Sequence, residues 1–431
     1  MRRKSGIAAL LSVVLLCVQT TGCIGEKTGV AVREKRKEVL TLMAVGTGYE
    51  QAFTDVIEAA AERFNEDNPY NVEIRAEWYE NEQYKEKLAM LMTQNEVTDI
   101  FFTWEAGFLE NYVKSGKVAP VSEVLKKDPE WSSRFEEGAF DAVTFDGEIY
   151  ALPMGQAVIP VYYNKELFEK NKVQIPQTWE ELLKAITAFQ NAGVTPIAMG
   201  FREPWISGQM MLELSGGVGG IRLYEDTVNG MTGWEDGRWV ETGKAFQELA
   251  DCGAFEEDFL KVTNDEARRI FTEGRAAMYP MGTWDTAAVI SGFGGADQLG
   301  AFLMPAKNAR YQDTRIKTFE KLFAVSERCE NQEGAFAFLK TLTDEITQEE
   351  YMIKCGALPV TKVPTDSVDS LTREILELQG KVTNALTPMD RKLGEELGGE
   401  FNKVSLAVAG GADAKEQFLK LQAYAKREKE K

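Results

Sequence analysis

Histidine is absent from this chain of 431 residues. Without an imidazole, the chain cannot form Ser-His or Cys-His nucleophilic sites, histidine-ligated zinc sites or imidazole general bases. The sequence also lacks a G-x-S-x-G elbow, a G-x-x-x-x-G-K-[ST] phosphate loop and a C-x-x-C pair. A glycosidase stays chemically open, because that reaction needs only two carboxylates. We therefore expect no catalytic residue, no metal ion and no cofactor, with a carboxylate-dependent glycosidase as the alternative.

Cysteine is scarce, with five residues in the whole chain. Cys17 and Cys23 lie near the N-terminus, and Cys252, Cys329 and Cys355 are widely spaced. This pattern implies neither a disulfide framework nor a zinc knuckle. We expect the last three to be small buried apolar side chains, with one disulfide among them as the alternative.

Basic residues are outnumbered, since 49 Lys and Arg face 68 Asp and Glu and give a formal net charge of -19. A surface of this sign is a poor partner for nucleic acid and other polyanions. The acidic residues are spread along many segments, so most of them are expected on solvated faces. The charge favours a neutral or a cationic small-molecule ligand over an anionic one.

The N-terminal residues predict export from the cytoplasm. Three basic residues at 2–4 precede an apolar run at 7–18, which is too short for a membrane span. The sequence T-T-G-C ending at Cys23 is similar to the lipobox of bacterial lipoproteins, although Thr20 stands where leucine is usual. We predict cleavage before Cys23 and lipidation of its sulfur, with a plain secreted protein as the alternative.

Strand-like and helix-like runs alternate through the rest of the chain, which indicates an α/β fold with open sheets. In the first half, strands are predicted at 40–45, 72–78 and 100–103, and helices at 55–65 and 83–93.

A second series of such runs follows. Helices are predicted at 179–189, 241–250 and 264–271, strands at 196–200 and 277–281, and a return strand at 319–325. The glycines between Ser215 and Gly220 predict a flexible loop.

Four motifs resemble one known family. They are Y-N-K-E-L-F at 163–168, P-Q-T-W-E-E-L at 176–182, F-T-E-G-R-A-A-M-Y-P-M-G-T-W at 271–284 and G-A-L-P at 356–359. Together they resemble extracellular solute-binding protein family 1, the maltose-binding-protein-like sugar receptors of carbohydrate ABC importers. The resemblance implies a two-lobed, periplasmic-binding-protein-like fold of class II, in which hinge strands join two open α/β sheets.

The resemblance also implies a division of the chain into parts. The predicted hinge strands lie near 154–162 and 317–324. The predicted parts are a signal peptide at 1–22, a lipidated tether at 23–38, an N-terminal lobe at 39–155 plus 318–363, and a C-terminal lobe at 156–317 plus 364–431.

Sugar recognition needs aromatic faces to cover the C–H side of a pyranose and planar polar groups to bind its hydroxyls. Open α/β sheets place ligands at strand ends. Trp104 and Glu105 directly follow the strand predicted at 100–103. Trp284 and Asp285 end the long motif described above, in which the family's tryptophan commonly stacks on sugar. These residues are predicted to bind the ligand.

Three further ligand-binding residues are predicted from their positions. Glu50 follows the glycine-containing loop after the first strand, where a ligand can approach the backbone. Gln156 lies on the approach to the first hinge, and Trp205 follows a strand of the second lobe. The remaining tryptophans in segments that read as polar loops are not assigned to the site: Trp131, Trp234 and Trp239.

The resemblance implies a lipid-anchored extracellular receptor that binds a mono- or oligosaccharide between its lobes and passes it to an ABC importer. The expected partners are the carbohydrate, the permease subunits and their ATPase, and the bacterial cell membrane through the lipid anchor, with no nucleic acid. A monomer is expected. A secreted glycosidase and a receptor of the same fold for peptides or polyamines are the alternatives.

Overall fold

The computed structural model describes residues 37–46 and 50–429. Cys23, the predicted signal peptide and most of the predicted tether lie outside the described residues. Within the described part, two hydrophobic cores form. One draws its residues from 40–154 and 322–360, and we call this part the N-terminal lobe. The other draws mainly on 158–316 and 371–425, and we call it the C-terminal lobe.

The N-terminal lobe is built on a mixed sheet in the strand order β12-β6-β11-β3-β1-β2. β1 pairs in parallel with both β2 and β3, whereas β11 runs antiparallel to β3 and β6. This arrangement places the carboxyl ends of β1 and β3 at one edge of the sheet, next to each other. The strands are β1 (Glu38–Val45), β2 (Val72–Tyr79), β3 (Ile100–Thr103), β6 (Leu152–Val158), β11 (Thr314–Val325) and β12 (Leu358–Pro359).

Amphipathic helices cover this sheet. In α1 the apolar residues recur at helical spacing, and all of the set Phe53, Val56, Ile57, Ala60 and Phe64 are buried. The helices of the lobe are α1 (Gln51–Glu66), α2 (Asn81–Gln94), α3 (Gly107–Lys114), α4 (Ser122–Lys127), α5 (Pro129–Ser132), α12 (Gln332–Leu342) and α13 (Glu345–Cys355), with a small hairpin of β4 (Thr144–Phe145) and β5 (Glu148–Ile149).

The C-terminal lobe has a smaller sheet in the order β10-β7-β9-β8. Its strands are β7 (Pro160–Asn164), β8 (Thr195–Ile197), β9 (Ala276–Pro280) and β10 (Leu299–Leu303). Local signals fix the neighbouring helices. Thr178 caps α7 (Trp179–Asn191) by accepting from the Glu181 amide, and Thr263 with Glu266 forms a capping box at α10 (Asn264–Thr272).

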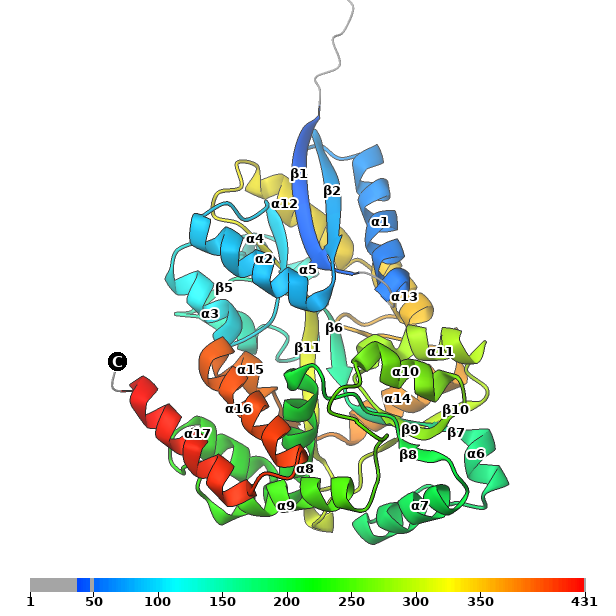
Figure 1. The fold of residues 1–431 in the computed structure, drawn as a ribbon. Helices are drawn as coiled ribbons and strands as arrows, with labels where there is room; N and C mark the ends of the chain where they lie inside the picture. Colours follow the sequence, from blue (N-terminus) through cyan, green and yellow to red (C-terminus); the bar gives the residue numbers. More distant parts are fainter. Residues whose placement is uncertain (1–36, 47–49, 430–431) are drawn as a thin grey trace, which may run out of the picture. The chain divides into compact units, whose positions relative to one another are not determined.

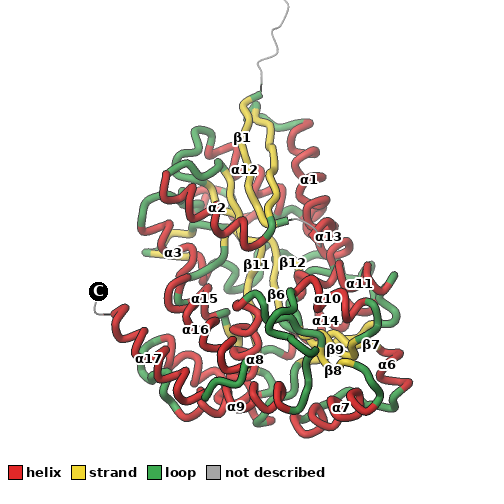
Figure 2. The backbone as a smooth tube through the Cα atoms, in the orientation of Figure 1, coloured by secondary structure: helices red, strands yellow, loops and turns green. Residues whose placement is uncertain are grey.

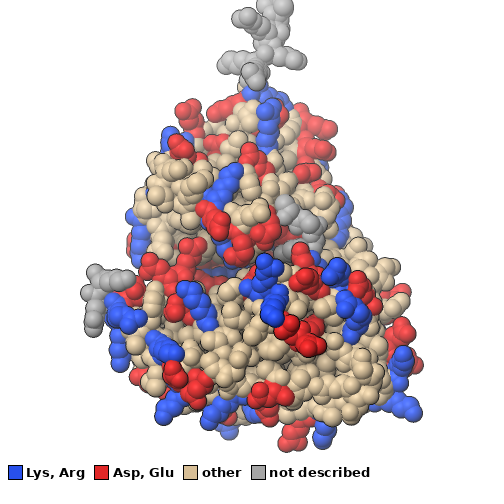
Figure 3. Space-filling model, in the orientation of Figure 1, with Lys and Arg blue, Asp and Glu red and all other residues tan. Residues whose placement is uncertain are grey.

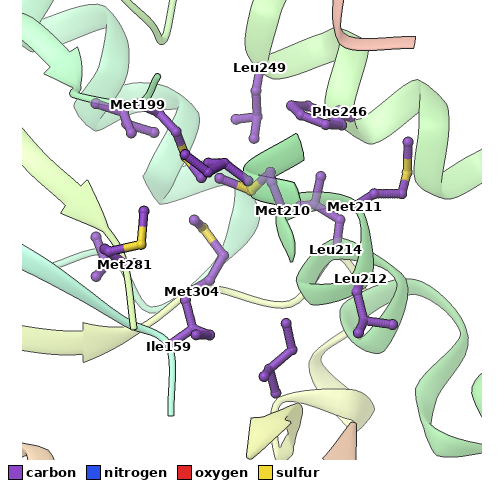
Figure 4. Close-up of a cluster of buried hydrophobic side chains, with 14 of the residues drawn as sticks. Ile159, Met199, Met210, Met211, Leu212, Leu214, Phe246, Leu249, Met281 and Met304 are labelled. Carbon is purple, nitrogen blue, oxygen red and sulfur yellow. The ribbon is translucent and has the colours of Figure 1, made fainter. Parts of the chain in front are cut away.

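A second layer of helices completes this lobe. α8 (Pro204–Val228) packs against α9 (Gly237–Asp251) and α16 (Gly394–Ala409), and Figure 4 shows Met210, Met211 and Leu214 of α8 beside Phe246 and Leu249 of α9. The other elements are α6 (Lys165–Lys170), α11 (Thr286–Phe293), α14 (Ser370–Lys381), β13 (Asn384–Leu386), α15 (Met389–Lys392) and α17 (Ala414–Lys429).

Two long strands connect the lobes. β6 leads through Ile159 directly into β7 of the other sheet. β11 begins beside β13, continues along β6 and ends beside β3, so a single strand contacts both lobes (Figures 1 and 2). Movement of one lobe relative to the other must therefore bend this antiparallel pair.

The strands and helices predicted from the sequence are confirmed, and most extend by a few residues beyond the predicted bounds. The strand predicted at 196–200 is shorter, because β8 ends at Ile197, and the strand predicted at 277–281 is shifted by one residue. The predicted loop between Ser215 and Gly220 is wrong. These residues are buried inside α8, which is kinked at Gly220 with φ 64. A Cβ on Gly216 would lie 2.5 Å from the carbonyl oxygen of Thr314. Glycine is needed at 216 because α8 packs there directly on the backbone of β11, which leaves no room for a side chain.

Candidate ligand-binding cleft

A cavity of about 520 Å³ lies between the two lobes. The N-terminal lobe supplies the ends of β1 and β3 and one face of α2, and the C-terminal lobe supplies the start of α8, the residue Trp284 and parts of α15 and α16. β11 contributes Glu320 and Lys321. Because both lobes and a connecting strand line the cavity, a molecule bound there would contact all three.

Tryptophans from both lobes reach the cavity. Trp205 at the start of α8 meets Trp284, with ring centroids 6.2 Å apart and planes inclined by 60°. Trp104 comes from the other lobe, directly after β3, and packs edge-on against Phe102 and Phe108. Trp205 and Trp284 are half-buried, whereas Trp104 is 9% exposed. The cavity therefore has aromatic surface on opposite walls.

A buried ionic network forms around Asp285, the residue that follows Trp284 in the chain. Asp285 is fully buried and accepts hydrogen bonds from the Tyr279 hydroxyl and from Nη1 of Arg268, at 3.2 Å. Burial is the largest single effect on Arg268 and lowers the pKa of the guanidinium, but Asp285, Tyr279 and Asp265 together outweigh it and raise this pKa. On the cavity side, the guanidinium carbon of Arg391 lies 5.9 Å from the ring centroid of Trp284.

The base of the cavity holds a buried charge cluster. The ammonium group of Lys321 donates to Glu50 and lies 4.3 Å from the ring centroid of Phe53. Burial raises the pKa of Glu320 to about 7, against the opposing effect of Lys321, and the Tyr351 hydroxyl donates to this carboxyl at 3.0 Å. Lys321 has φ 52, in the left-handed region that residues with side chains seldom adopt.

The lobes also touch beside the cavity. Nη1 of Arg391, in the C-terminal lobe, lies 3.5 Å from Oε1 of Glu105, which also accepts from the Thr318 hydroxyl. The start of α3 reaches the turn between α15 and α16, where a Cβ on Gly107 would lie 2.9 Å from the amide nitrogen of Gly394. The structure is therefore closed at this edge of the cleft.

Of the residues predicted from the sequence to bind ligand, Glu50, Trp104, Trp205 and Trp284 line the cavity. The other three do not. Asp285 is enclosed by its own network, and Glu105 is 1% exposed at the contact between the lobes. Gln156 donates to the carbonyl oxygen of Pro359 and accepts from Gln379. Their contact with a ligand stays a prediction, as it does for the four lining residues.

Sequence reasoning missed several polar residues of the lining: Gln209, Glu320, Lys321, Arg391 and Asn402. One of them had a local signal, because Gln209 follows Trp205 by one helical turn and so shares its face of α8. The others come from a strand and helices that the chain reaches much later, and nothing in their own segments marks them.

No group of three or more Cys, Asp or Glu side chains in the described residues is placed to hold a metal ion. In the same residues, no helix has the length and apolar content needed to cross a membrane.

Residues 59–373 match the family of bacterial extracellular solute-binding proteins. Among curated proteins, an uncharacterised ABC transporter extracellular-binding protein of Pyrococcus horikoshii is 27% identical over 92% of this chain and 91% of its own length. The maltodextrin-binding protein of Bacillus subtilis is 24% identical over 66% of this chain and 64% of its own length.

Solved structures agree in fold over nearly the whole chain. A structure from a study of xylan utilisation by Caldanaerobius polysaccharolyticus is 28% identical, has a TM-score of 0.83 and covers 89% of this chain and 99% of its own. A chitin oligosaccharide binding protein has the same TM-score with 24% identity, over 90% of this chain and 98% of its own. The predicted two-lobed α/β fold is confirmed by this agreement.

Proposed function

The chain belongs to the bacterial extracellular solute-binding proteins, and we propose that it binds a carbohydrate in the cleft between its lobes and delivers it to an ABC importer. The observation that carries this proposal is the placement of Trp104, Trp205 and Trp284 on opposite walls of one cavity that also contains polar side chains. Indole faces cover the C–H surfaces of pyranose rings, and carboxylate, amide and guanidinium groups bind the hydroxyls between them.

Related proteins support this class of ligand. A multiple sugar-binding protein of Streptococcus mutans is 24% identical over 47% of this chain and 49% of its own length. The Bacillus subtilis relative binds maltodextrin, and the solved neighbour binds chitin oligosaccharides, according to their names. These ligands differ from one another, so the proposal for this chain is a mono- or oligosaccharide without a fixed sugar.

Capture would proceed by closure of the lobes. A sugar that contacts Trp104 on one lobe and Trp205 with Trp284 on the other binds the closed form better than the open one, and this differential affinity shifts the population toward closure. The bending would occur along the β6 and β11 pair, which is the predicted hinge. In this proposal the protein works as a monomer and makes or breaks no bond.

We place the receptor outside the cytoplasm, anchored through lipid on Cys23, with permease subunits and an ATPase as its transport partners. The basic and apolar N-terminal residues support export, and the residues before Cys23 support lipidation. Cys23→Ser should abolish incorporation of labelled palmitate and release the protein from the membrane fraction of the producing cells. Retention of label in that variant would contradict the anchor.

The function is tested by a thermal-shift screen of the purified mature chain against oligosaccharides, peptides and polyamines. A ligand that binds only the folded protein raises its melting temperature, so sugars alone should produce a shift. The sugar mixtures are then assayed for new reducing ends. A shift only with amines or peptides would overturn the carbohydrate assignment, and release of reducing ends would favour a glycosidase.

A further inference from the structure

Two buried polar atoms on the cavity wall have no hydrogen-bond partner within the described residues: Oε2 of Glu50 and Nε2 of Gln209. Both side chains line the cavity, and they are 6% and 5% exposed. Glu50 immediately precedes α1 of the N-terminal lobe, whereas Gln209 belongs to α8 of the C-terminal lobe. Buried polar atoms almost always have a partner in folded proteins, so these two point to a partner that the cavity receives.

The two side chains are held in place by their surroundings. The other oxygen of Glu50 accepts from Lys321, and this contact holds the side chain with Oε2 free to accept. Gln209 follows Gly208, where an added Cβ would lie 1.8 Å from Oδ1 of Asn402 on α16. This close contact of α8 with α16 fixes the face of the helix that carries Gln209 and Trp205.

The two atoms require opposite hydrogen-bonding groups on a ligand, one that donates and one that accepts. The Glu50 carboxylate can only accept a hydrogen bond, and the Gln209 amide nitrogen can only donate one. A hydroxyl group both donates and accepts, so hydroxyls of a neutral sugar can satisfy both atoms. An ammonium group satisfies Glu50 but leaves Gln209 unpaired, and a ligand carboxylate satisfies Gln209 but has no proton to donate to Glu50.

We propose that Glu50 and Gln209 hold the hydroxyls of one neutral sugar unit between the lobes and thereby exclude amino sugars and uronic acids from this position. This inference rests on the proposed function and narrows it. The nearby Lys321 does not alter the preference, because its charge is already paired with Glu50. The acidic side chains on the cavity wall also outnumber the basic ones, which disfavours an anionic ligand.

Binding of a sugar to both Glu50 and Gln209 also requires the cleft to be closed. Each atom comes from a different lobe, so a sugar unit bound to both is held only when the cleft is closed. In the open form the unit would keep one of the two contacts and bind more weakly.

The first experiment uses matched probes in isothermal titration calorimetry at about pH 6. Neutral trimers of xylose, glucose and N-acetylglucosamine are compared with the glucosamine trimer, and methyl-esterified trigalacturonate is compared with the free acid. We expect binding only among the neutral trimers. Tighter binding of a charged trimer than of every neutral one would overturn this inference but leave the carbohydrate function intact. No binding by any sugar would overturn both.

The second experiment uses Gln209→Leu and Glu50→Gln with the neutral trimer that binds best. Each change should weaken binding at least tenfold. Gln209→Leu removes a buried unpaired amide, so its melting temperature without ligand should not fall. The matched control is Gln247→Leu, since that glutamine donates to the carbonyl oxygen of Ala412 away from the cavity and should leave the affinity unchanged.

A double variant completes the test. If both side chains hold the same sugar unit, Glu50→Gln combined with Gln209→Leu should lose less affinity than the two single losses predict together. Unchanged affinity in both single variants would overturn the proposal. A lower melting temperature of Glu50→Gln alone would then assign Glu50 to the packing around Lys321.

Discussion

The rings of Trp205 and Trp284 meet edge to face, 6.2 Å apart at their centroids, although they come from different elements of the C-terminal lobe. Trp205 follows Pro204 in the first turn of α8, and Trp284 lies in the short 3-10 turn Thr283–Asp285 that follows β9. Inclined by 60°, the two rings form a corner on the cavity wall and not a single flat platform. A sugar placed in this corner would contact one ring by its face and the other by its side.

Trp284→Ala should therefore weaken carbohydrate binding more than tenfold, because it removes one wall of the corner and a large apolar contact. The change should spare the fold, since this tryptophan is only half-buried. Affinity is measured by calorimetry with the best sugar of the screen. Tyr70→Ala is the control, because Tyr70 is 37% exposed and does not line the cavity. Equal affinity of the wild type and the Trp284 variant would contradict the site.

Asp285→Asn should affect the Trp284 ring indirectly, through the turn that contains both residues. The variant loses the negative charge that pairs with Arg268, although Asp265 still binds this guanidinium at 2.6 Å. Because breaking a buried pair leaves a charge poorly compensated, the free energy of unfolding should fall by about 3 kcal/mol. Urea unfolding measures this change, and titration with sugar measures the accompanying loss of affinity from a less fixed Trp284. Unchanged stability would show that the network does not support this turn.

Local sequence patterns predicted many of the helices and strands. The cavity residues that were missed depend on packing between distant segments. The Thr178 cap and the apolar spacing of α1 lie within short segments, so sequence alone located those elements. The tryptophan at 284 was found through its family motif. Arg391 could not be found in this way, because only the folded chain brings α15 next to Trp284.

The burial of three tryptophans in segments that read as polar loops could not be predicted from the sequence either. Trp131 lies in α5 and Trp239 in α9, and both are almost completely buried, as is Trp234. Their neighbours along the chain are polar because those neighbours face solvent. Figure 3 shows one face of the molecule, on which charged side chains of both signs are interspersed. The three indole rings are buried in the cores, and the polar composition of their segments does not predict this burial.

Gly216→Ala tests the packing of α8 on β11. The new methyl group would lie 2.5 Å from the carbonyl oxygen of Thr314, so the helix or the strand must shift, and we expect a loss of about 1–3 kcal/mol in unfolding free energy. Gly380→Ala is the matched control on α14. It meets no atom within 4 Å and should be neutral or stabilise by about 0.5–1 kcal/mol. Thermal and urea unfolding of both variants give the comparison, and equal stabilities would contradict the close contact.

Gly107→Ala tests the contact between the lobes. Its methyl group would lie 2.9 Å from backbone atoms of both Lys392 and Gly394, so the closed edge of the cleft must open slightly. We expect a larger radius of gyration in small-angle scattering with ligand bound, and a roughly tenfold weaker affinity from about 1.4 kcal/mol of lost closure. The cores of the two lobes should keep their helical circular dichroism. A wild-type radius and affinity would show that closure does not need this contact.

Glu320→Gln should change how stability depends on pH. Burial raises the pKa of Glu320 to about 7 in the folded protein, whereas an unfolded glutamate titrates near pH 4.3. Between these values the folded state binds more protons than the unfolded state, so this group's stabilising contribution is present at low pH and is lost as the pH rises toward 7. Burial also raises the pKa of Glu213 and Glu256 to about 7, and they contribute in the same direction.

The variant removes only one of these titrations, and its amide oxygen can still accept from the Tyr351 hydroxyl. Its unfolding free energy should therefore fall less steeply than that of the wild type between pH 5 and 7, by up to about 1.4 kcal/mol per pH unit. Urea unfolding at several pH values measures both slopes, with Glu166→Gln on the exposed face of α6 as the control. Parallel slopes for wild type and Glu320→Gln would mean that Glu320 keeps its charge in the folded state, because Lys321 then compensates fully for its burial.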